Sequence, residues 1–141
     1  MRLVIQRVAE AAVKVEGKTV AEIGRGLMVL VGVEEGDTRE DCLWLVGKTA
    51  GMRIFDDEND VMNLSVKDIE GEVLAISQFT LTASTKKGNR PSYIRAAGHA
   101  TAIPLYELYC EELSKTLGHE VGRGIFGADM KVSLINDGPV T

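Results

Sequence analysis

Two continuous apolar runs constrain the fold of this chain most strongly. The first covers residues 27–33, Leu-Met-Val-Leu-Val-Gly-Val, and the second covers residues 73–76, Val-Leu-Ala-Ile. Apolar runs without polar alternation are typical of β-strands that are covered on both faces. We therefore expect two interior strands, with other parts of the chain packed against both of their faces.

The second run continues in an unusual way, as Ser77-Gln78-Phe79-Thr80-Leu81, where turn residues such as Gly or Asp normally follow a buried strand. One interpretation is an amphipathic strand with Thr80 and Thr82 outward and Phe79 and Leu81 inward, since such strands alternate with a period of two. The other is a functional segment that gathers three neutral polar side chains around one aromatic ring. The segment alone leaves both interpretations open.

Strand signals dominate the rest of the chain. Residues 3–15 alternate toward a turn at Gly17, and the chain returns with alternation, which predicts a β-hairpin. Short strands are predicted at residues 52–55 and 121–126, and a longer alternating strand is predicted at residues 130–135.

Two helices are predicted from the signals at their ends. Asp37 or Thr38 can cap the first helix, whereas Pro104 suits the first turn of a second helix that stops at Gly118. Trp44 falls beside the apolar stripe of the first helix and is interpreted as a packing residue. Antiparallel hairpins without a βαβ rhythm predict an α+β fold, built as a strongly bent, mostly antiparallel β-sheet or barrel with two packed helices.

Length and composition indicate one globular domain, residues 1–141, with 45% hydrophobic and 26% charged residues. Cys42 and Cys110 lie far apart in helix-like segments, so we interpret them as buried thiols in a reducing compartment. The apolar start at residues 1–5 meets Gln6 at once and is too short for a secretory signal or a membrane span. We therefore expect a cytoplasmic protein without a membrane partner.

The net charge of the chain is negative, but one stretch of it carries only positive charges. A net charge of −5 argues against a nucleic-acid partner, because Lys and Arg drive phosphate binding. All 21 acidic residues, however, lie outside residues 73–106, a stretch with five basic side chains: Lys86, Lys87, Arg90, Arg95 and His99. The basic loop is either a merely solvated segment or a local positive field for a polyanionic substrate.

The sequence contains few of the metal ligands and titratable side chains that conventional hydrolases use. The two histidines and two cysteines lack the spacing of a zinc site, and the acidic turn at residues 56–60 lacks the glycine and glutamate of a calcium loop. Thr80 has no local base, because the nearest acidic residues are Glu72 and Glu107. A nucleophilic Thr80 is therefore less favoured than an oxyanion site made by the backbone N–H groups of Phe79 and Thr80.

Four motifs in order resemble those of one family, the D-aminoacyl-tRNA deacylases. They are Arg-Leu-Val-Ile-Gln-Arg-Val at residues 2–8, Ser-Gln-Phe-Thr-Leu at 77–81, Lys-Gly-Asn-Arg-Pro-Ser at 87–92 and Gly-Pro-Val-Thr at 138–141. The resemblance spans the whole chain and implies the same α+β fold in a homodimer, with the active site at the subunit interface. It also implies hydrolysis of the ester of D-aminoacyl-tRNA, a chirality proofreading step that needs no metal and no cofactor.

The resemblance assigns roles to particular residues. The catalytic segment that it implies is Ser77, Gln78, Phe79 and Thr80. The residues that it implies for chirality selection are Gly138 and Pro139, joined by a cis bond, although only about 5–6% of X-Pro bonds are cis. A cis bond turns both carbonyls toward one side, where they clash with an L side chain.

The expected partner follows from the same resemblance. A pocket that rejects side chains by their handedness admits glycine, so the expected partner is tRNA carrying a D-amino acid or glycine. The residues assigned to tRNA binding belong to the basic loop: Lys86, Lys87, Asn89 and Arg90. Two alternatives stay open, namely a non-catalytic RNA-binding module and a hydrolase of another small ester.

Overall fold

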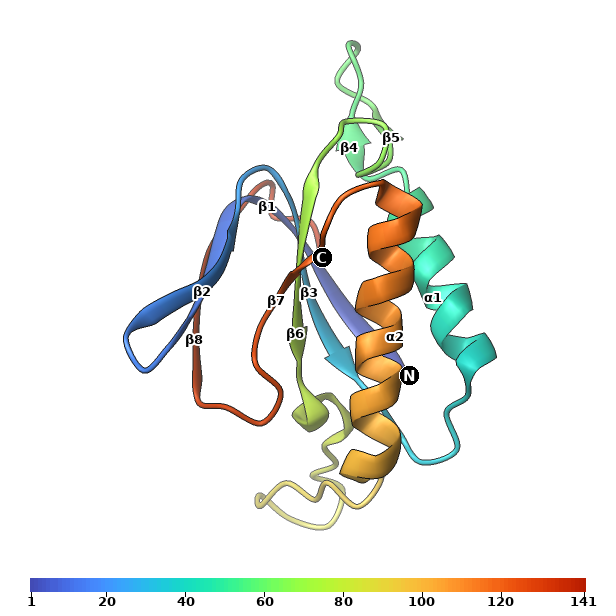
Figure 1. The fold of residues 1–141 in the computed structure, drawn as a ribbon, viewed down its shortest axis with the longest axis vertical. Helices are drawn as coiled ribbons and strands as arrows, with labels where there is room; N and C mark the ends of the chain where they lie inside the picture. Colours follow the sequence, from blue (N-terminus) through green and yellow to red (C-terminus); the bar gives the residue numbers. More distant parts are fainter.

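The computed structural model describes all residues, 1–141, and contains eight β-strands, two α-helices and one short 3₁₀-helix (Figure 1). The elements in chain order are β1 (Arg2–Val15), β2 (Lys18–Ile23), β3 (Gly26–Gly32), α1 (Arg39–Gly51), β4 (Phe55–Asp56), β5 (Met62–Leu64), β6 (Glu72–Ser77), η1 (Phe79–Thr82), α2 (His99–Leu117), β7 (Gly122–Arg123) and β8 (Met130–Asn136).

The long strand β1 organises the main sheet, whose order is β2-β1-β3-β6-β7 with β8 also paired to β1. The first half of β1 pairs with β3, whereas its second half pairs with β2 on one edge and with β8 on the other. Register shifts after Val8 and Val13 mark irregular positions of the kind that increase bending and twist. The predicted strongly bent sheet is confirmed, and Figure 1 shows β2 and β8 swung away from β3 and β6.

The pairing of β3 with β6 corrects the prediction that the fold lacks a βαβ rhythm. These two strands are parallel, with Val31 opposite Ser77, and β7 is also parallel to β6. The chain between β3 and β6 contains α1, which supplies the crossover that a parallel pair requires. The separate β4–β5 hairpin in the same connection hides this crossover in the sequence. The main sheet is therefore mixed, with three antiparallel pairs and two parallel ones.

Both faces of the two interior strands are covered, as their apolar runs predict. Val73, Leu74 and Ala75 are consecutive along β6, and each has 0% exposure. One face packs against α1 and α2, which lie side by side over the sheet in Figure 1. The other face packs in a second cluster with Val8 and Val13 of β1. The end of β6 is consequently fixed from both sides.

The thiols and the first helix agree with their predictions in most respects. Cys42 and Cys110 are buried, and burial raises the pKa of each thiol to about 11. Thr38 caps α1, and its side chain and that of Asp41 form a reciprocal capping box. Trp44 is 63% exposed and lies against Lys48, so its interpretation as a packing residue is wrong. Neither helix is long and apolar enough to cross a bilayer.

The second helix begins earlier than predicted. α2 starts at His99, so Pro104 lies inside the helix rather than in its first turn. The early start carries no side-chain cap, because the N-cap residue is Gly98, and the sequence therefore gives little signal there. The predicted stop is confirmed, since Gly118 has φ 82° in the left-handed region.

Several predicted strands are shorter than expected. The strand expected at residues 52–55 is β4 at Phe55–Asp56, and the strand expected at residues 121–126 is limited to β7. The amphipathic-strand interpretation of the segment after Ile76 is wrong, because β6 ends at Ser77 and the chain turns into η1. This turn reverses the expected exposure: Phe79 is 55% exposed and Thr82 only 3%.

Candidate active site at the end of strand β6

The backbone at the end of β6 leaves two amide donors unused by the turn. The N–H of Gln78 donates to Val31 O at 2.7 Å, and η1 begins with the bond from Leu81 N to Gln78 O at 3.3 Å. The N–H groups of Phe79 and Thr80 therefore take no part in the hydrogen bonds of η1, as at the start of any helix. This turn packs closely on β3, because a Cβ at Gly32 would lie 3.0 Å from Leu81 Cβ.

Hydrogen bonds and an aromatic contact fix the side chains of this segment. The Gln78 amide donates to the Thr80 hydroxyl, and Thr82 Oγ1 donates to Phe79 O at 2.9 Å. The exposed Phe79 ring packs edge-on against Tyr93, with ring centroids 5.1 Å apart. An amide N–H is not a base, so the hydrogen bond to Thr80 does not activate its hydroxyl as a nucleophile. The geometry favours the backbone donors over that hydroxyl.

A cleft of about 680 Å³ opens beside this segment. Its walls are the ends of β3 and β6, the first turns of α2 and the loop before β8, and most of its lining is apolar. Besides Phe79, three aromatic side chains line the same cleft as Ser77 and Gln78: His99, Tyr106 and Phe126. The Tyr106 hydroxyl donates to Ala75 O at 2.8 Å, and burial raises its pKa, so it acts in packing.

No pattern in the sequence indicates this cleft. Phe126 was predicted only as part of a strand, and His99 only as part of a basic stretch. No local signal in the sequence connects residues 126–130 with the end of β6, because the two segments meet only through the sheet and α2.

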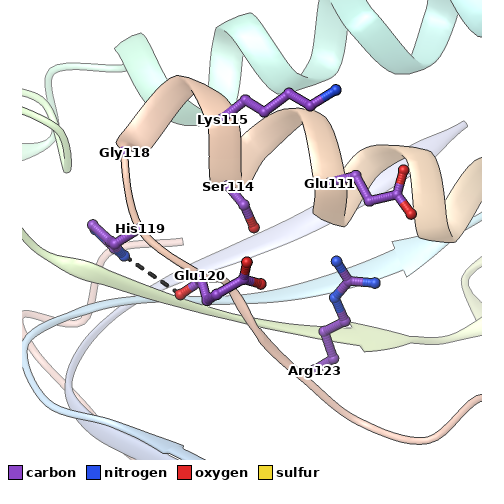
Figure 2. A pocket seen from close by; sticks show the side chains of 7 residues that line it. All are labelled: Glu111, Ser114, Lys115, Gly118, His119, Glu120 and Arg123. Atoms are coloured by element: carbon purple, nitrogen blue, oxygen red, sulfur yellow. Dashed lines mark hydrogen bonds between the residues drawn. The ribbon is translucent and has the colours of Figure 1, made fainter.

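A second hollow at the C-terminal end of α2 has a different character (Figure 2). It has no hydrophobic lining residue; it is lined by Glu111, Ser114, Lys115, Gly118, His119, Glu120 and Arg123. The hydrogen bond drawn there joins His119 Nδ1 to Glu120 O at 3.4 Å. Charges of both signs and the lack of hydrophobic side chains make this hollow a poor match for an aminoacyl group or a nucleobase.

The tail motif is anchored by Arg7, a residue to which sequence patterns assign no role of its own. Arg7 is only 7% exposed, and its guanidinium donates to Asp137 O at 2.9 Å and to Ile54 O at 2.8 Å. Backbone bonds reinforce this contact, since Arg7 N donates to Val140 O and Asp137 N donates to Arg7 O. Gly138 and Pro139 are exposed between these anchors, and the bond that joins them is cis.

The structure does not bring the tail motif to the end of β6 within one chain. Arg7 pairs with Leu27, which pairs with Val73, whereas Ser77 lies four residues further along β6. At about 3.3 Å per residue, this offset is about 13 Å along the strand. The two predicted parts of the site are therefore separate in a single copy of the chain.

The basic loop does lie near the end of β6. It is closed by paired backbone bonds between Ser84 and Ser92, and the next residue, Tyr93, contacts Phe79. Lys86, Lys87, Asn89 and Arg90 are all exposed and make no ion pair. Arg95 is different, because it pairs with Glu34 at 2.8 Å. The free positive charges thus lie on the same side of the molecule as the unused amides.

Comparison with solved structures defines the fold first. The structure of a protein named c-Myc DNA Unwinding Element Binding Protein superposes with a TM-score of 0.93 and 39% identity, covering 99% of this chain and 95% of that one. A second structure, of a probable eukaryotic D-amino acid tRNA deacylase, has a TM-score of 0.83 at 19% identity and covers 97% of this chain and 94% of that one. The second likeness concerns the fold alone.

Comparison with sequences then defines the family. A family model described as D-Tyr-tRNA(Tyr) deacylase matches residues 4–141. Relatives named D-aminoacyl-tRNA deacylase from Flavobacterium johnsoniae and Phocaeicola vulgatus are 61% and 63% identical over all of this chain and 94% of each relative. The chain belongs to the D-Tyr-tRNA(Tyr) deacylase family, which confirms the resemblance stated from its four motifs.

Proposed function

We propose that this protein hydrolyses the ester of D-aminoacyl-tRNA, which releases the free amino acid and the tRNA as a chirality proofreading step in translation. The observation that carries the proposal is the pair of unused amides at Phe79 and Thr80 beside an apolar cleft. The family and the names of the relatives support the same reaction. Because its substrate belongs to translation, we expect the protein to act in the cytoplasm.

The proposed chemistry is attack of water on the ester carbonyl. A bond forms between the water oxygen and the carbonyl carbon, the bond to the ribose oxygen breaks, and the proton released by water passes to that ribose oxygen. The N–H groups of Phe79 and Thr80 stabilise the intermediate oxyanion, a contribution worth about 10²–10³ in rate where such donors have been removed. The neighbouring ribose 2′-hydroxyl can assist the attack. This route requires neither a metal nor a cofactor.

The cleft offers a place for the nucleotide that carries the ester. An ester bound at Phe79 and Thr80 has the terminal adenosine of tRNA attached to its oxygen, and the adjoining wall presents the Phe126 ring. Aromatic rings stack on bases with about 1–3 kcal/mol per base. The basic loop, with Lys86, Lys87, Asn89 and Arg90, then lies where it can contact the phosphates.

Selection against L-amino acids is assigned to Gly138 and Pro139 of a second copy in a homodimer. The offset of about 13 Å along β6 keeps this motif away from the amides within one chain, and its exposure leaves it available to a partner. A twofold axis makes each such contact twice. The carbonyls of the motif then exclude an L side chain and admit glycine, so glycyl-tRNA is also a substrate.

Matched D-tyrosyl-, L-tyrosyl- and glycyl-tRNA provide the first test. We expect release of D-tyrosine and glycine without added metal, and little release of L-tyrosine. Protection of all three substrates would indicate a binding module instead. Cleavage of a simple aminoacyl ester that lacks tRNA, at a similar rate, would indicate a hydrolase of small esters.

Subunit mixing tests the shared site. One variant, Thr80→Tyr, blocks the turn at residues 77–80. The other variant, Gly138→Val, displaces the tail, because φ is 130° at this position and a Cβ would lie 2.9 Å from Val140 Cγ2. After random exchange, half of the dimers are mixed, and each mixed dimer has one intact site and one site that carries both changes. About a quarter of the D-selective activity should therefore return. No recovery after verified exchange, or a monomer in solution, would contradict the shared site.

A nucleic-acid-binding role without hydrolysis is the second candidate. It is favoured by the unpaired cations of the basic loop and by the structural likeness, at 39% identity, to a protein whose name describes DNA binding. Such a protein would bind tRNA with or without an attached amino acid and release nothing. The three-substrate assay separates the two functions directly.

A further inference from the structure

One face of α2 forms a slot for the ring of Phe126. His99, Ala102 and Tyr106 follow one another at i, i+3 and i+7, the spacing that puts side chains on one side of a helix. Phe126 packs against the cluster that contains Ala102, edge-on to His99 at 5.6 Å and tilted to Tyr106 at 6.0 Å. The small side chain at position 102 leaves the space between the two larger rings.

The backbone around Phe126 does not by itself fix this ring. Phe126 stands at the tip of a tight turn, in which Ala128 N donates to Ile125 O at 3.1 Å and Gly127 has φ 77°. Such a turn sets the direction of the backbone, whereas the χ angles of a side chain at its tip are set by packing. The Phe126 ring is half-buried, so its orientation depends on the residues of α2 that it touches.

The two ends of the slot are held to different degrees. Tyr106 is only 4% exposed, and its hydroxyl is bonded to the carbonyl of Ala75 on β6. His99 is the first residue of α2 and is exposed, and its imidazole makes no hydrogen bond or ion pair in the structure. Its one aromatic contact is Phe126. His99 is thus placed to support a ring rather than to transfer a proton.

We propose that His99 is a positioning residue for the terminal nucleotide of the substrate, acting through Phe126. Its edge-to-face contact closes the open end of the slot and holds the Phe126 ring where a base stacks on it. This inference rests on the proposed deacylation and on the assignment of the cleft to the terminal adenosine. It assigns His99 to the binding of the nucleotide and not to cleavage of the ester.

Steady-state kinetics with D-tyrosyl-tRNA test the proposal. His99→Ala should raise KM about 2- to 12-fold, the effect that corresponds to the loss of one aromatic pair, and should leave kcat unchanged. His99→Phe keeps a ring edge and should restore the wild-type KM. His119→Ala is the matched control, because it removes the other histidine of the chain, which lies outside the cleft.

Three kinetic outcomes would overturn the role of His99 while the proposed function stands. They are an unchanged KM in His99→Ala, a fall in kcat at constant KM, and a failure of His99→Phe to restore KM in a folded variant. Circular dichroism spectra that match the wild type establish folding. If the wild-type protein does not release D-tyrosine from D-tyrosyl-tRNA, the proposed function is overturned rather than the role of His99.

A binding measurement decides the proposal independently of catalysis. The chain has two histidines, so the imidazole proton signals of His99 and His119 can be assigned with the two alanine variants. Titration with adenosine monophosphate should shift the His99 signal and leave the His119 signal in place. Phe126→Ala should abolish that shift, since the base then lacks its stacking ring. A nucleotide that moves neither signal would overturn the assignment.

Discussion

The proposed catalytic turn at residues 77–80 and the tail at residues 137–140 are built in opposite ways. At the catalytic turn the backbone donors are unused and Phe79 is 55% exposed, so the segment is open to a ligand. At the tail, the guanidinium of the buried Arg7 and two backbone bonds fix the chain on either side of Gly138. In the proposed function, the first region offers groups to the reaction, whereas the second offers a rigid shape.

This difference matches what the two proposed roles require, namely stabilisation of an oxyanion and rejection of one enantiomer. Stabilisation of an oxyanion needs donors that no other group occupies and that already point at the position where the charge develops. Rejection of one enantiomer needs atoms that do not yield when a side chain presses on them, because a mobile tail would move aside. The buried Arg7 gives the tail that resistance although Gly138 and Pro139 themselves are exposed.

Removal of one amide donor at the catalytic turn should have the largest effect. Phe79→Pro deletes an N–H group and should lower kcat by about 10²–10³, whereas Thr80→Ala keeps both amides and should retain most of the activity. Single-turnover release of D-tyrosine measures both rates. Phe79→Leu is the control for loss of the ring. A folded Thr80→Ala without activity would assign the chemistry to the hydroxyl.

Loss of the tail anchor should affect discrimination more than turnover. Arg7→Met leaves the carbonyls of Ile54 and Asp137 without their donor, which should destabilise the fold by about 1–3 kcal/mol. The ratio of D- to L-tyrosyl-tRNA cleavage should fall while D-specific kcat changes little. Denaturant unfolding and parallel kinetics measure the two effects, with the exposed Lys14→Met on the same strand as the control. An unchanged D/L ratio would show that the tail does not need this anchor.

Charge removal in the basic loop should weaken tRNA binding and leave the catalytic turn and the tail unchanged. The triple variant Lys86→Gln, Lys87→Gln and Arg90→Gln loses three exposed cations that make no ion pair within the protein. The slope of log affinity against log salt should fall by about 0.7–0.9 per lost phosphate contact, at a constant D/L ratio. Filter binding of tRNA at several salt concentrations provides the slopes. An unchanged slope would identify the loop as a solvated segment.

A change at the cap of α1 should lower stability without touching either region. Thr38→Ala removes the hydroxyl that accepts from Asp41 N and should cost about 1 kcal/mol, the usual cost of a lost N-cap. Activity and D/L ratio should stay at wild-type values at 25 °C. Thermal unfolding measures the loss, and altered selectivity in this variant would show that the tail responds to general stability.

The same cap should contribute to acid sensitivity. Hydrogen bonds from the Thr38 backbone and side chain lower the pKa of Asp41. A carboxyl whose pKa is lower in the folded state stabilises the protein above the unfolded value and loses that contribution as pH falls through the folded value. Asp41→Asn should therefore lower the melting temperature at pH 7 and have little effect well below pH 4, near the unfolded value. An equal effect at both pH values would contradict the contribution of this carboxylate.

Local patterns in the sequence predicted elements whose cause is local. The hairpin of β1 and β2, the Thr38 cap and the Gly118 stop each depend on residues within a few positions of one another. The apolar run of β6 likewise predicted burial on both faces, because the lack of polar alternation can be read from consecutive residues. Pro104 misled the prediction, because a proline is compatible with a first turn and the uncapped start at Gly98 gives no competing signal.

The candidate site was predicted only in the part that is continuous in the chain. The segment from Ser77 to Thr80 and the Gly138–Pro139 step were identified from their motifs, but the exposure of Phe79 and the burial of Thr82 follow from the 3₁₀ turn. The parallel pairing of β3 with β6 sets where that turn lies. Hydrophobic patterning does not specify strand direction, so the sequence pattern alone did not predict it.

By itself, the sequence determined where the long strands lie, where α2 stops, and which short motifs carry the family. Tertiary structure alone decided that Arg7 anchors the tail, and that Phe126 and His99 line a cleft with Gln78. It also decided that the anchor of the tail lies four residues before Ser77 in the register of the sheet, an offset of about 13 Å along β6. The physical reason is that propensity, capping and periodicity act over a few neighbouring residues, whereas these contacts join segments that meet only when both faces of the sheet are covered.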